Sequence, residues 1–293
     1  MMKKKILIST VVLIFSIVCT QSQYQILSIP KDAYSISSND GFSSLYNVFD
    51  SSNPASQNNN KINNYSLVYF PADIKFANFK INNFSLSILN YGTIKEEIDN
   101  VVLNQFTANE YSFSYKYNWE IINQHPSISL RFGLNAGFYY SKIDNFNSYG
   151  IVSSVGLSNL FKNINLSIGL SVNNLGMSLK NYSNSAIDFP TYYSFNLAYK
   201  YKNMLLGYTF KKNQYLIDDE HIAAIKFIIK SNIYLNFSTT SYAQNLVIND
   251  NDKYFYGSSI GIGYKINSYN IYLGLKNIGI SGNILAITIS NTF

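Results

Sequence analysis

The sequence predicts an all-β protein, a closed antiparallel β-barrel of about 14 strands that spans a membrane. Only 13% of its 293 residues are charged, whereas soluble globular proteins carry about 25%. Tyr and Phe supply 26 and 20 residues, yet the mean hydropathy of −0.03 is too low for repeated membrane-spanning helices. Short segments of alternating polar and apolar residues fill the chain from Asn64 onward. This alternation is typical of strands with two unlike faces.

The first 22 residues have the features of a secretory signal peptide. Lys3, Lys4 and Lys5 precede an apolar core from Ile6 to Val18, and Ser22 ends a small-x-small cleavage site. The apolar core is too short for a membrane anchor, and the residues before Cys19 are not those of a lipoprotein signal. Cleavage would remove the only cysteine and lower the net charge from +6 to about +3. We therefore expect no disulfide, no Cys-based metal site and no nucleic-acid partner.

Residues 23–63 form a separate region. They are rich in Ser and Asn, include Pro30, Pro54 and Gly41, and show no sustained periodicity. One or two short helices could form between Ala33 and Phe49. The remaining residues, 64–293, are predicted to form the barrel.

The barrel region contains fourteen alternating segments, an even number, as closed bacterial barrels have. Most have about 8 to 12 residues, which suits tilted strands that cross a bilayer. A spanning sheet must close on itself, because lipid offers no hydrogen-bond partner to the backbone. The predicted strands are 64–70, 73–80, 83–90, 110–118, 127–141, 148–157, 164–173, 191–202, 203–211, 220–229, 231–239, 256–266, 269–276 and 283–293.

The two faces of these strands differ in composition. One face is aliphatic with Tyr or Phe near the strand ends, as lipid contact and aromatic girdles require. The other face carries Ser, Asn, Gly and Lys, which predicts a polar lumen. A soluble secreted β-sandwich also alternates, but it would expose more charge. Phe293 shares a face with Leu285, Ile287 and Ile289, and an aromatic C-terminus on an amphipathic strand resembles the assembly signal of outer-membrane barrels.

No catalytic or metal-binding constellation is evident, so we expect neither enzymatic activity nor a cofactor. The two histidines, His125 and His221, are far apart, and the acidic residues 218–220 and 95–99 are expected to lie in solvated loops. Arg131 falls on the lumen face of a long strand. A buried guanidinium needs a carboxylate or carbonyl partner, so we expect an ion pair across the lumen. Contact with a ligand and solvation by lumen water are the alternatives.

Several short motifs follow one another along the chain. They are Ile26–Ala33, Asn53-Pro54-Ala55, Leu89–Gly92, Phe106–Tyr111, Tyr140–Asp144, Asn173–Gly176 with Leu179–Tyr182, Phe189-Pro190 and Glu220–Ile222. This ordered set resembles the PorQ group of FadL-like outer-membrane barrels, which belong to the type IX secretion system. The Gly-Gly pair of that group is absent around Ser38 to Gly41, and Asn104 replaces a glycine. Membership of the PorV group or of another group of FadL-type barrels therefore remains an alternative.

The resemblance implies a FadL-like barrel in the outer membrane, surrounded by lipid and monomeric, with residues 23–63 as an N-terminal plug or hatch. It further implies a non-catalytic role in which the barrel anchors a PorZ-like surface protein of the cell-surface attachment complex. Residues 92–109 and 241–255 are the longest candidate loops for that partner. The alternatives are a FadL-type transporter of hydrophobic small molecules and a PorV-like cargo shuttle. A transporter should have a continuous apolar path inside, which the polar inner face does not favour.

Overall fold

The computed structural model describes residues 24–45, 52–56, 62–98, 101–122, 125–182, 189–214, 219–241 and 255–292. The predicted signal peptide, most of the 241–255 loop and Phe293 lie outside these residues, and so does Asp218 in the acidic stretch before His221.

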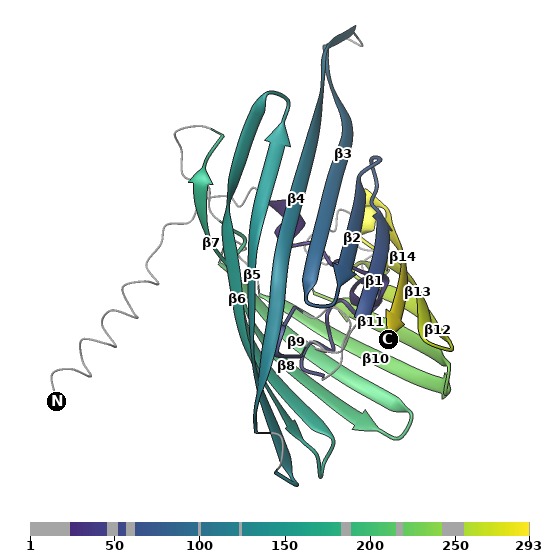
Figure 1. The fold of residues 1–293 in the computed structure, drawn as a ribbon. Coiled ribbons are helices and arrows are strands. Elements are labelled where there is room, and N and C mark those ends of the chain that lie inside the picture. Colours follow the sequence, from purple (N-terminus) through teal and green to yellow (C-terminus); the bar gives the residue numbers. More distant parts are fainter. Residues whose placement is uncertain are drawn as a thin grey trace, which may run out of the picture.

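Fourteen antiparallel strands form one closed barrel, and each strand pairs with its neighbours in the sequence (Figure 1). The pairing of β1 with β14 closes the ring, with Val68 opposite Ala286. The predicted fold class and strand number are confirmed. The strands are β1 Ile62–Tyr69, β2 Lys75–Ile81, β3 Phe84–Ile98, β4 Val101–Ile122, β5 Ile128–Ile143, β6 Phe146–Phe161, β7 Leu166–Lys180, β8 Tyr192–Tyr201, β9 Met204–Asn213, β10 Glu220–Lys230, β11 Ile233–Thr240, β12 Ser259–Ile266, β13 Tyr269–Asn277 and β14 Asn283–Thr292.

The largest error of the sequence prediction concerns residues 92–109, which were expected to form a loop. They continue β3 and β4 as a two-stranded ribbon that projects beyond the barrel (Figure 1). The pairing of β2 with β3 ends at Asn90, whereas β3 and β4 remain paired as far as Ile98 and Val101. The two strands of a hairpin ribbon satisfy each other's backbone hydrogen bonds without needing an apolar face. The absence of alternation was therefore not evidence for a loop.

The two ends of the barrel differ. One end holds the C-terminal end of β14 and tight turns such as Asn82-Asn83, Lys202-Asn203 and Asn267-Ser268. The first residue of each of these turns has a positive φ, between 49° and 54°, as two-residue hairpin turns require. The connections at the other end include the longer ones, among them 181–191, 241–258 and the β3–β4 ribbon. We refer to them as the short-turn end and the long-loop end.

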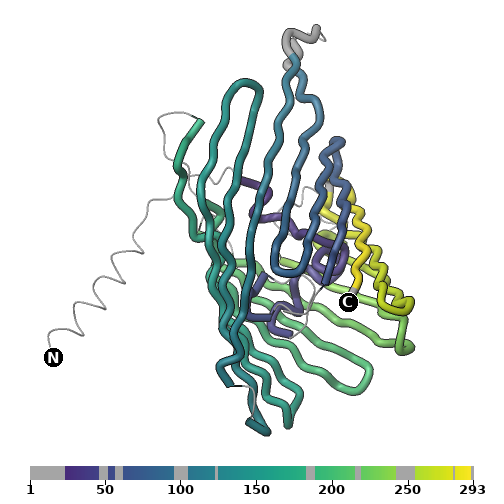
Figure 2. Tube along the Cα trace, in the orientation of Figure 1, coloured from purple at the N-terminus to yellow at the C-terminus, as the bar shows by residue number. Residues whose placement is uncertain are grey.

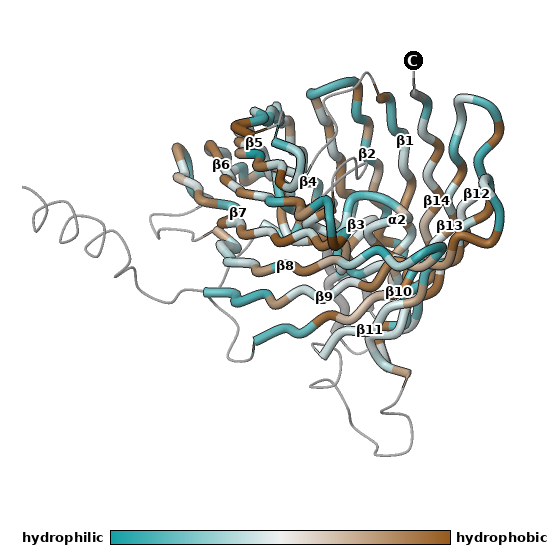
Figure 3. Tube along the Cα trace, turned by 90° about the horizontal axis from the view of Figure 1, so that it is seen from below, coloured by the Kyte–Doolittle hydropathy of each residue, from teal (hydrophilic) through white to brown (hydrophobic). Residues whose placement is uncertain are grey.

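The alternation of residues divides each strand between the outside and the inside of the barrel. On β1, Tyr65, Leu67 and Tyr69 are 44–48% exposed, whereas Asn64 and Val68 are buried. Hydrophobic and hydrophilic residues alternate along the strands in Figure 3. The structure contains no helix that is both long and apolar enough to cross a membrane among the residues it describes.

The N-terminal segment, defined here as the described residues between 24 and 56, lies inside the ring of strands (Figure 2). It contains the 3₁₀ turns η1 Gln25–Leu27 and η2 Pro54–Ser56 and the short helix α2 Ala33–Ser38. Asp32 caps α2 by accepting a 2.6 Å hydrogen bond from the Ser35 amide. Asn39 ends the helix in the left-handed conformation, at φ 49°.

Candidate functional site: the interior of the barrel

Glycines on the inner face let the N-terminal segment approach the wall at backbone distance. A Cβ atom built at Gly133 on β5 would overlap the backbone of Pro54 and Ala55. One at Gly207 on β9 would overlap the carbonyl of Gly41, and one at Gly274 on β13 would come within 2.5 Å of the Ala33 carbonyl oxygen. The segment and the wall are therefore complementary in shape on opposite sides of the barrel.

The Asn53-Pro54-Ala55 motif is one of these contact points. All three residues are buried. The Asn53 side-chain amide donates to the Leu157 carbonyl on β6 at 3.0 Å and to the Leu170 carbonyl on β7 at 3.4 Å. Its Oδ1 accepts a 3.0 Å hydrogen bond from the Ala55 amide. Asn53 thus joins the segment to two strands and also shapes the turn that places Pro54 against Gly133.

The second motif, Asn174-Leu175-Gly176, lies on β7 at a break in the β6–β7 register. Asn174 has a φ of 59°. Its side-chain amide donates to the carbonyls of Leu27 in the segment (3.0 Å) and Pro190 in the β7–β8 connection (3.1 Å). Gly176 faces Phe189, while Leu175 is exposed on the outer surface. Asn174 therefore links the segment, the wall and a loop at one point.

The turn Asn39-Asp40 makes polar contacts with three strands. The Asn39 side-chain amide donates to hydroxyl groups of Ser238 on β11 (2.9 Å) and Ser259 on β12 (3.0 Å). The Lys211 ammonium on β9 donates to the Asp40 carboxylate at 3.1 Å, and both side chains are about 15% exposed. The Lys276 ammonium on β13 and the Glu220 carboxylate on β10 lie near this ion pair. This cluster lies at the long-loop end, because it includes residues near the ends of β9, β10 and β13.

A buried carboxylate holds the beginning of the segment. Glu110 on β4 is 4% exposed. It accepts hydrogen bonds from the Ile26 amide at 2.8 Å and from the Tyr91 hydroxyl at 2.9 Å. From the sequence, Glu110 was noted only as part of the Phe106–Tyr111 motif, and Asp40 and Lys211 were not identified. Glu110 and Lys211 could have been found in the sequence as charged residues at inward-facing positions of predicted strands.

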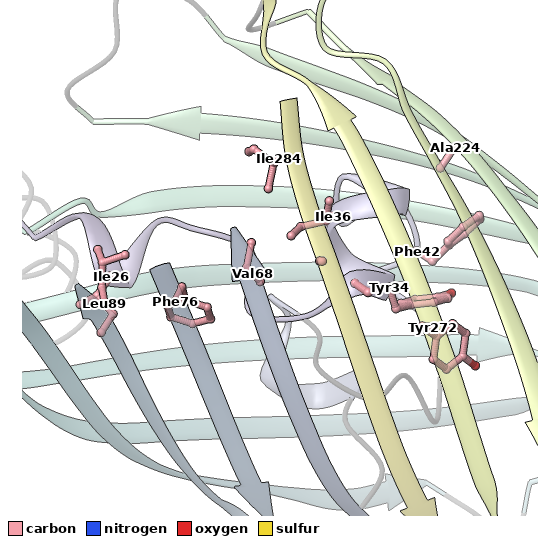
Figure 4. Packing of buried hydrophobic residues seen from close by; sticks show 12 residues of the cluster. Ile26, Tyr34, Ile36, Phe42, Val68, Phe76, Leu89, Ala224, Tyr272 and Ile284 are labelled. Atoms are coloured by element: carbon pink, nitrogen blue, oxygen red, sulfur yellow. The ribbon is translucent and has the colours of Figure 1, made fainter. Parts of the chain in front are cut away.

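One arc of the inner face is apolar, contrary to the expectation of a polar lumen. Leu89 on β3, Phe76 on β2, Val68 on β1 and Ala286 on β14 are successive cross-strand partners, and each is at most 2% exposed. We call these four residues the apolar arc. Side chains of the segment pack against it, with Ile26 beside Leu89 and Ile36 in the same buried cluster (Figure 4).

The apolar arc was not predicted, because the alternation of residues shows on which face of the sheet a residue lies but not which residues of other strands lie beside it. Phe76 and Val68 occupy inward positions of short strands whose other inward residues, such as Asn78, Asn64 and Ser66, are polar. Only the register of the closed barrel brings the four apolar residues into one row. Each fully buried aliphatic or aromatic side chain in such a row contributes about 1.5–3 kcal/mol.

Arg131 has its carboxylate partner on the adjacent strand and not across the lumen. Arg131 on β5 is directly opposite Glu120 on β4 in the register, and the guanidinium donates to the Glu120 carboxylate. The guanidinium is 15% exposed and the carboxylate 39%. The distance between residues on adjacent strands is shorter than the distance across the lumen, so the carboxylate on the neighbouring strand pairs with the guanidinium.

Each histidine has a simple polar contact with a described neighbour. His221 is exposed on β10 and its Nδ1 is 2.8 Å from the Tyr208 hydroxyl. His125 lies at the short-turn end, where it accepts a hydrogen bond from the Ser127 amide. Among the residues with described positions, no three His, Cys, Asp or Glu side chains are arranged to hold a metal ion.

A polar cavity of about 70 Å³ remains between the segment and strands β4 to β8. Its lining includes Ser112, Ser114, Asn135, Asn173 and Asp40. A water molecule needs about 10–15 Å³ of such space, so several could fit. The interior therefore has a small polar cavity near β4–β8 and a buried apolar surface at the apolar arc.

The sequence matches no protein-family model and no curated protein. Similar solved structures exist. A mutant of the TodX monoaromatic hydrocarbon channel has a TM-score of 0.54 at 10% identity, over 90% of this chain and 99% of that one. The Pseudomonas putida toluene transporter TodX has a TM-score of 0.50 at 10% identity, over 93% of this chain and 97% of that one. A Pseudomonas aeruginosa FadL homologue is also similar, at a TM-score of 0.46 and 10% identity, over 90% and 99% of the two chains.

The fold is FadL-like. The protein is an integral β-barrel of the outer membrane, as predicted. Outer-membrane barrels place short turns on the periplasmic side and longer loops on the extracellular side. The short-turn end is therefore periplasmic, and the cluster around Asp40 and Lys211 lies toward the extracellular end.

Proposed function

We propose that this FadL-like barrel admits small hydrophobic molecules through the outer membrane and that its N-terminal segment is the plug. The apolar arc carries this proposal. Ile26 and Ile36 cover the arc, and their withdrawal would leave four neighbouring apolar residues on successive strands as a surface for a hydrophobic solute. The likeness in fold to a toluene transporter supports the same function.

The plug covers the apolar arc in the structure described here, so passage requires the plug to withdraw from it. Ile26 and Ile36 occupy the place that a hydrophobic solute would take. Hydrogen bonds and one ion pair hold the segment to the wall at many points, among them Glu110, Asn53 and Asp40, and withdrawal must break or replace them. Exposure of the arc to water is unfavourable in proportion to its area, and a hydrophobic solute reduces that cost.

Uptake of radiolabelled toluene by intact cells tests the proposal. The protein is expressed in a strain without its own hydrocarbon channels, beside a variant with Phe76→Asn and Leu89→Asn. Uptake should rise above the empty-vector level with the natural sequence and should fall with the variant, because it makes the arc polar. Ser171→Asn, an inward change on β7 away from the arc, is the matched control. Equal uptake with the natural protein and the empty vector would contradict the proposal.

The second candidate is a PorQ-like anchor of the type IX attachment complex, and the β3–β4 ribbon favours it. Residues 91–98 and 101–107 project past their neighbouring strands at the extracellular end, where a surface protein could bind. A PorV-like cargo shuttle would use the same face. This candidate rests on the ribbon and on the motif resemblance.

Purification of the barrel from membranes with its bound proteins tests this second candidate. We expect a PorZ-like surface protein to remain bound to the natural chain. A variant in which residues 93–107 are replaced by a short turn should lose it, while a variant with a shortened 242–254 loop is the control. If the natural chain retains no surface protein, the anchoring role is wrong and the transport proposal is unaffected.

A further inference from the structure

An aromatic cluster lies inside the barrel near its extracellular end. Tyr24 of the N-terminal segment, Tyr139 on β5 and Phe189 in the β7–β8 connection form it together with Val152. The ring centroids of Tyr24 and Tyr139 are 4.1 Å apart, and the Phe189 ring lies 5.0 Å from Tyr139 and 5.4 Å from Tyr24. Phe189 meets Tyr139 edge-on, at 78°, a favourable geometry for two aromatic rings.

The wall behind Phe189 is shaped for a flat ring. A Cβ atom at Gly176 on β7 would overlap the Phe189 ring, so the glycine supplies a surface without a side chain. Gly150 on β6 has the same relation to the ring of Tyr139. The position occupied by Phe189 is therefore enclosed by two aromatic rings, an aliphatic side chain and a bare patch of backbone.

The polar atoms around this position already have partners. The Tyr24 hydroxyl is 2.5 Å from the Ser148 hydroxyl, and the Tyr139 hydroxyl is 3.1 Å from that of Ser178. A group in this position would consequently contact mainly the faces and edges of aromatic rings. An uncharged group fits it better than a charged one, since a charge would lose its hydration without a partner.

Phe189 reaches this position from a loop and not from a strand. Hydrogen bonds at Pro190 and Thr191 hold the described end of this loop. The Thr191 hydroxyl donates to the Asn174 carbonyl at 2.9 Å, the Asn174 amide group donates to the Pro190 carbonyl at 3.1 Å, and the Gln214 amide donates to the Thr191 carbonyl at 3.0 Å. None of these bonds belongs to the pairing of the barrel strands, so the loop can shift and remove the ring while the strands stay paired.

We infer that Phe189 is the built-in occupant of a binding site for a small, uncharged aromatic ring, and that a solute enters by replacing it. The site shares Leu27, Val152 and Asn174 with the surroundings of the polar cavity, so it adjoins space further inside the barrel. This inference rests on the proposed transport function and names the first site that a solute would meet. An occupant tethered to the chain competes with the solute and lowers its apparent affinity.

Fluorine NMR titration of 4-fluorobenzyl alcohol into the full barrel in lipid nanodiscs tests the inference. Saturable binding is expected with the natural chain. Phe189→Ala should tighten it by about tenfold or more, because the competing ring is gone. Phe42→Ala is the matched control, since Phe42 is also buried inside the barrel (1% exposed, against 5% for Phe189) but lies in the other cluster. Equal tightening in both variants would reflect any new cavity and would overturn the inference, as would no tightening in Phe189→Ala.

A disulfide that fixes the loop provides a second readout. Positions 174 and 191 follow the last β7–β8 pair, Asn173 and Tyr192, and the Thr191 hydroxyl contacts the Asn174 carbonyl at 2.9 Å, so a disulfide can be designed between these neighbouring positions. The natural chain has one cysteine. In the Asn174→Cys/Thr191→Cys variant, oxidation should abolish binding of the probe and dithiothreitol should restore it, with each single variant as a control. Binding that is the same before and after reduction would overturn the inference.

The two proposals fail in different ways. If toluene uptake occurs in cells but the probe responds to neither Phe189→Ala nor the disulfide, transport stands and this site is wrong. If the probe binds as expected but cells take up no toluene, the aromatic site stands and the transport proposal fails.

Discussion

The carboxylate of Asp40 in the N-terminal segment and the ammonium of Lys211 on β9 form an ion pair of 3.1 Å inside the barrel. The pair joins residues 171 positions apart. The Asp40 carbonyl also accepts a hydrogen bond from the Thr209 hydroxyl at 3.1 Å, so two residues of one strand hold this turn. Charges inside a barrel are poorly screened by solvent, and this pair is therefore a principal polar anchor of the N-terminal segment.

Asp40→Asn and Lys211→Met should each lower the free energy of unfolding by about 1–3 kcal/mol, because each leaves a partly buried group without its partner. The double variant should lose less than the sum of the two. Urea titration of the barrel in lipid vesicles measures this, with Lys212→Met, on the outer face of β9, as the control. Strictly additive losses would show that the pair is not coupled.

Gly133→Ala should displace the turn at Asn53-Pro54-Ala55, because the new Cβ atom would overlap the backbone of Pro54 and Ala55. We expect a loss of about 1–3 kcal/mol, typical of overpacking, and faster proteolysis of the N-terminal segment. Ala136→Val, on the lipid-facing side of the same strand, is the control. Unchanged protease resistance of Gly133→Ala would mean that the segment does not depend on this contact.

Glu110→Gln should release the start of the segment. The carboxylate accepts from the Ile26 amide and the Tyr91 hydroxyl, and hydrogen bonds to a charged group are worth about 1.5–3 kcal/mol. Amide hydrogen exchange at Ile26 should accelerate in proportion, while exchange in the barrel strands should not. Glu120→Gln, on the same face of β4 but paired with Arg131, should leave Ile26 protected. Faster exchange at Ile26 in both variants would point to general loosening of β4.

Ile287→Arg tests which face of β14 meets lipid. Ile287 lies on the outer face, between the inward-facing Ala286 and Thr288. An arginine near the middle of a membrane strand costs about 2–4 kcal/mol, and the cost falls to about 0–1 kcal/mol near the interface. Asn291→Arg, near the periplasmic end of the same strand, should therefore cost much less. Equal costs at the two positions in vesicle unfolding experiments would contradict this placement of the strand.

Local alternation was sufficient to predict the strands. Each residue of a strand faces the side opposite to its neighbours, so a stretch such as 127–141 reveals both its conformation and its two faces, and β5 occupies 128–143. The β3–β4 ribbon was missed because residues 92–107 continue the two strands without a regular alternation of polar and apolar residues. Asn174 was identified as part of a motif, but its left-handed backbone and its bonds to Leu27 and Pro190 depend on segments far away in the sequence.

The sequence by itself determined the class of fold, the number of strands and the face on which each strand residue lies, because these follow from interactions within a few residues. The tertiary structure decided which inward residues meet. Leu89, Phe76, Val68 and Ala286 become one apolar row only when the register is set around the whole ring. The pairing of Asp40 with Lys211 and of Ile26 with Glu110 likewise depends on how deeply the N-terminal segment enters the closed barrel.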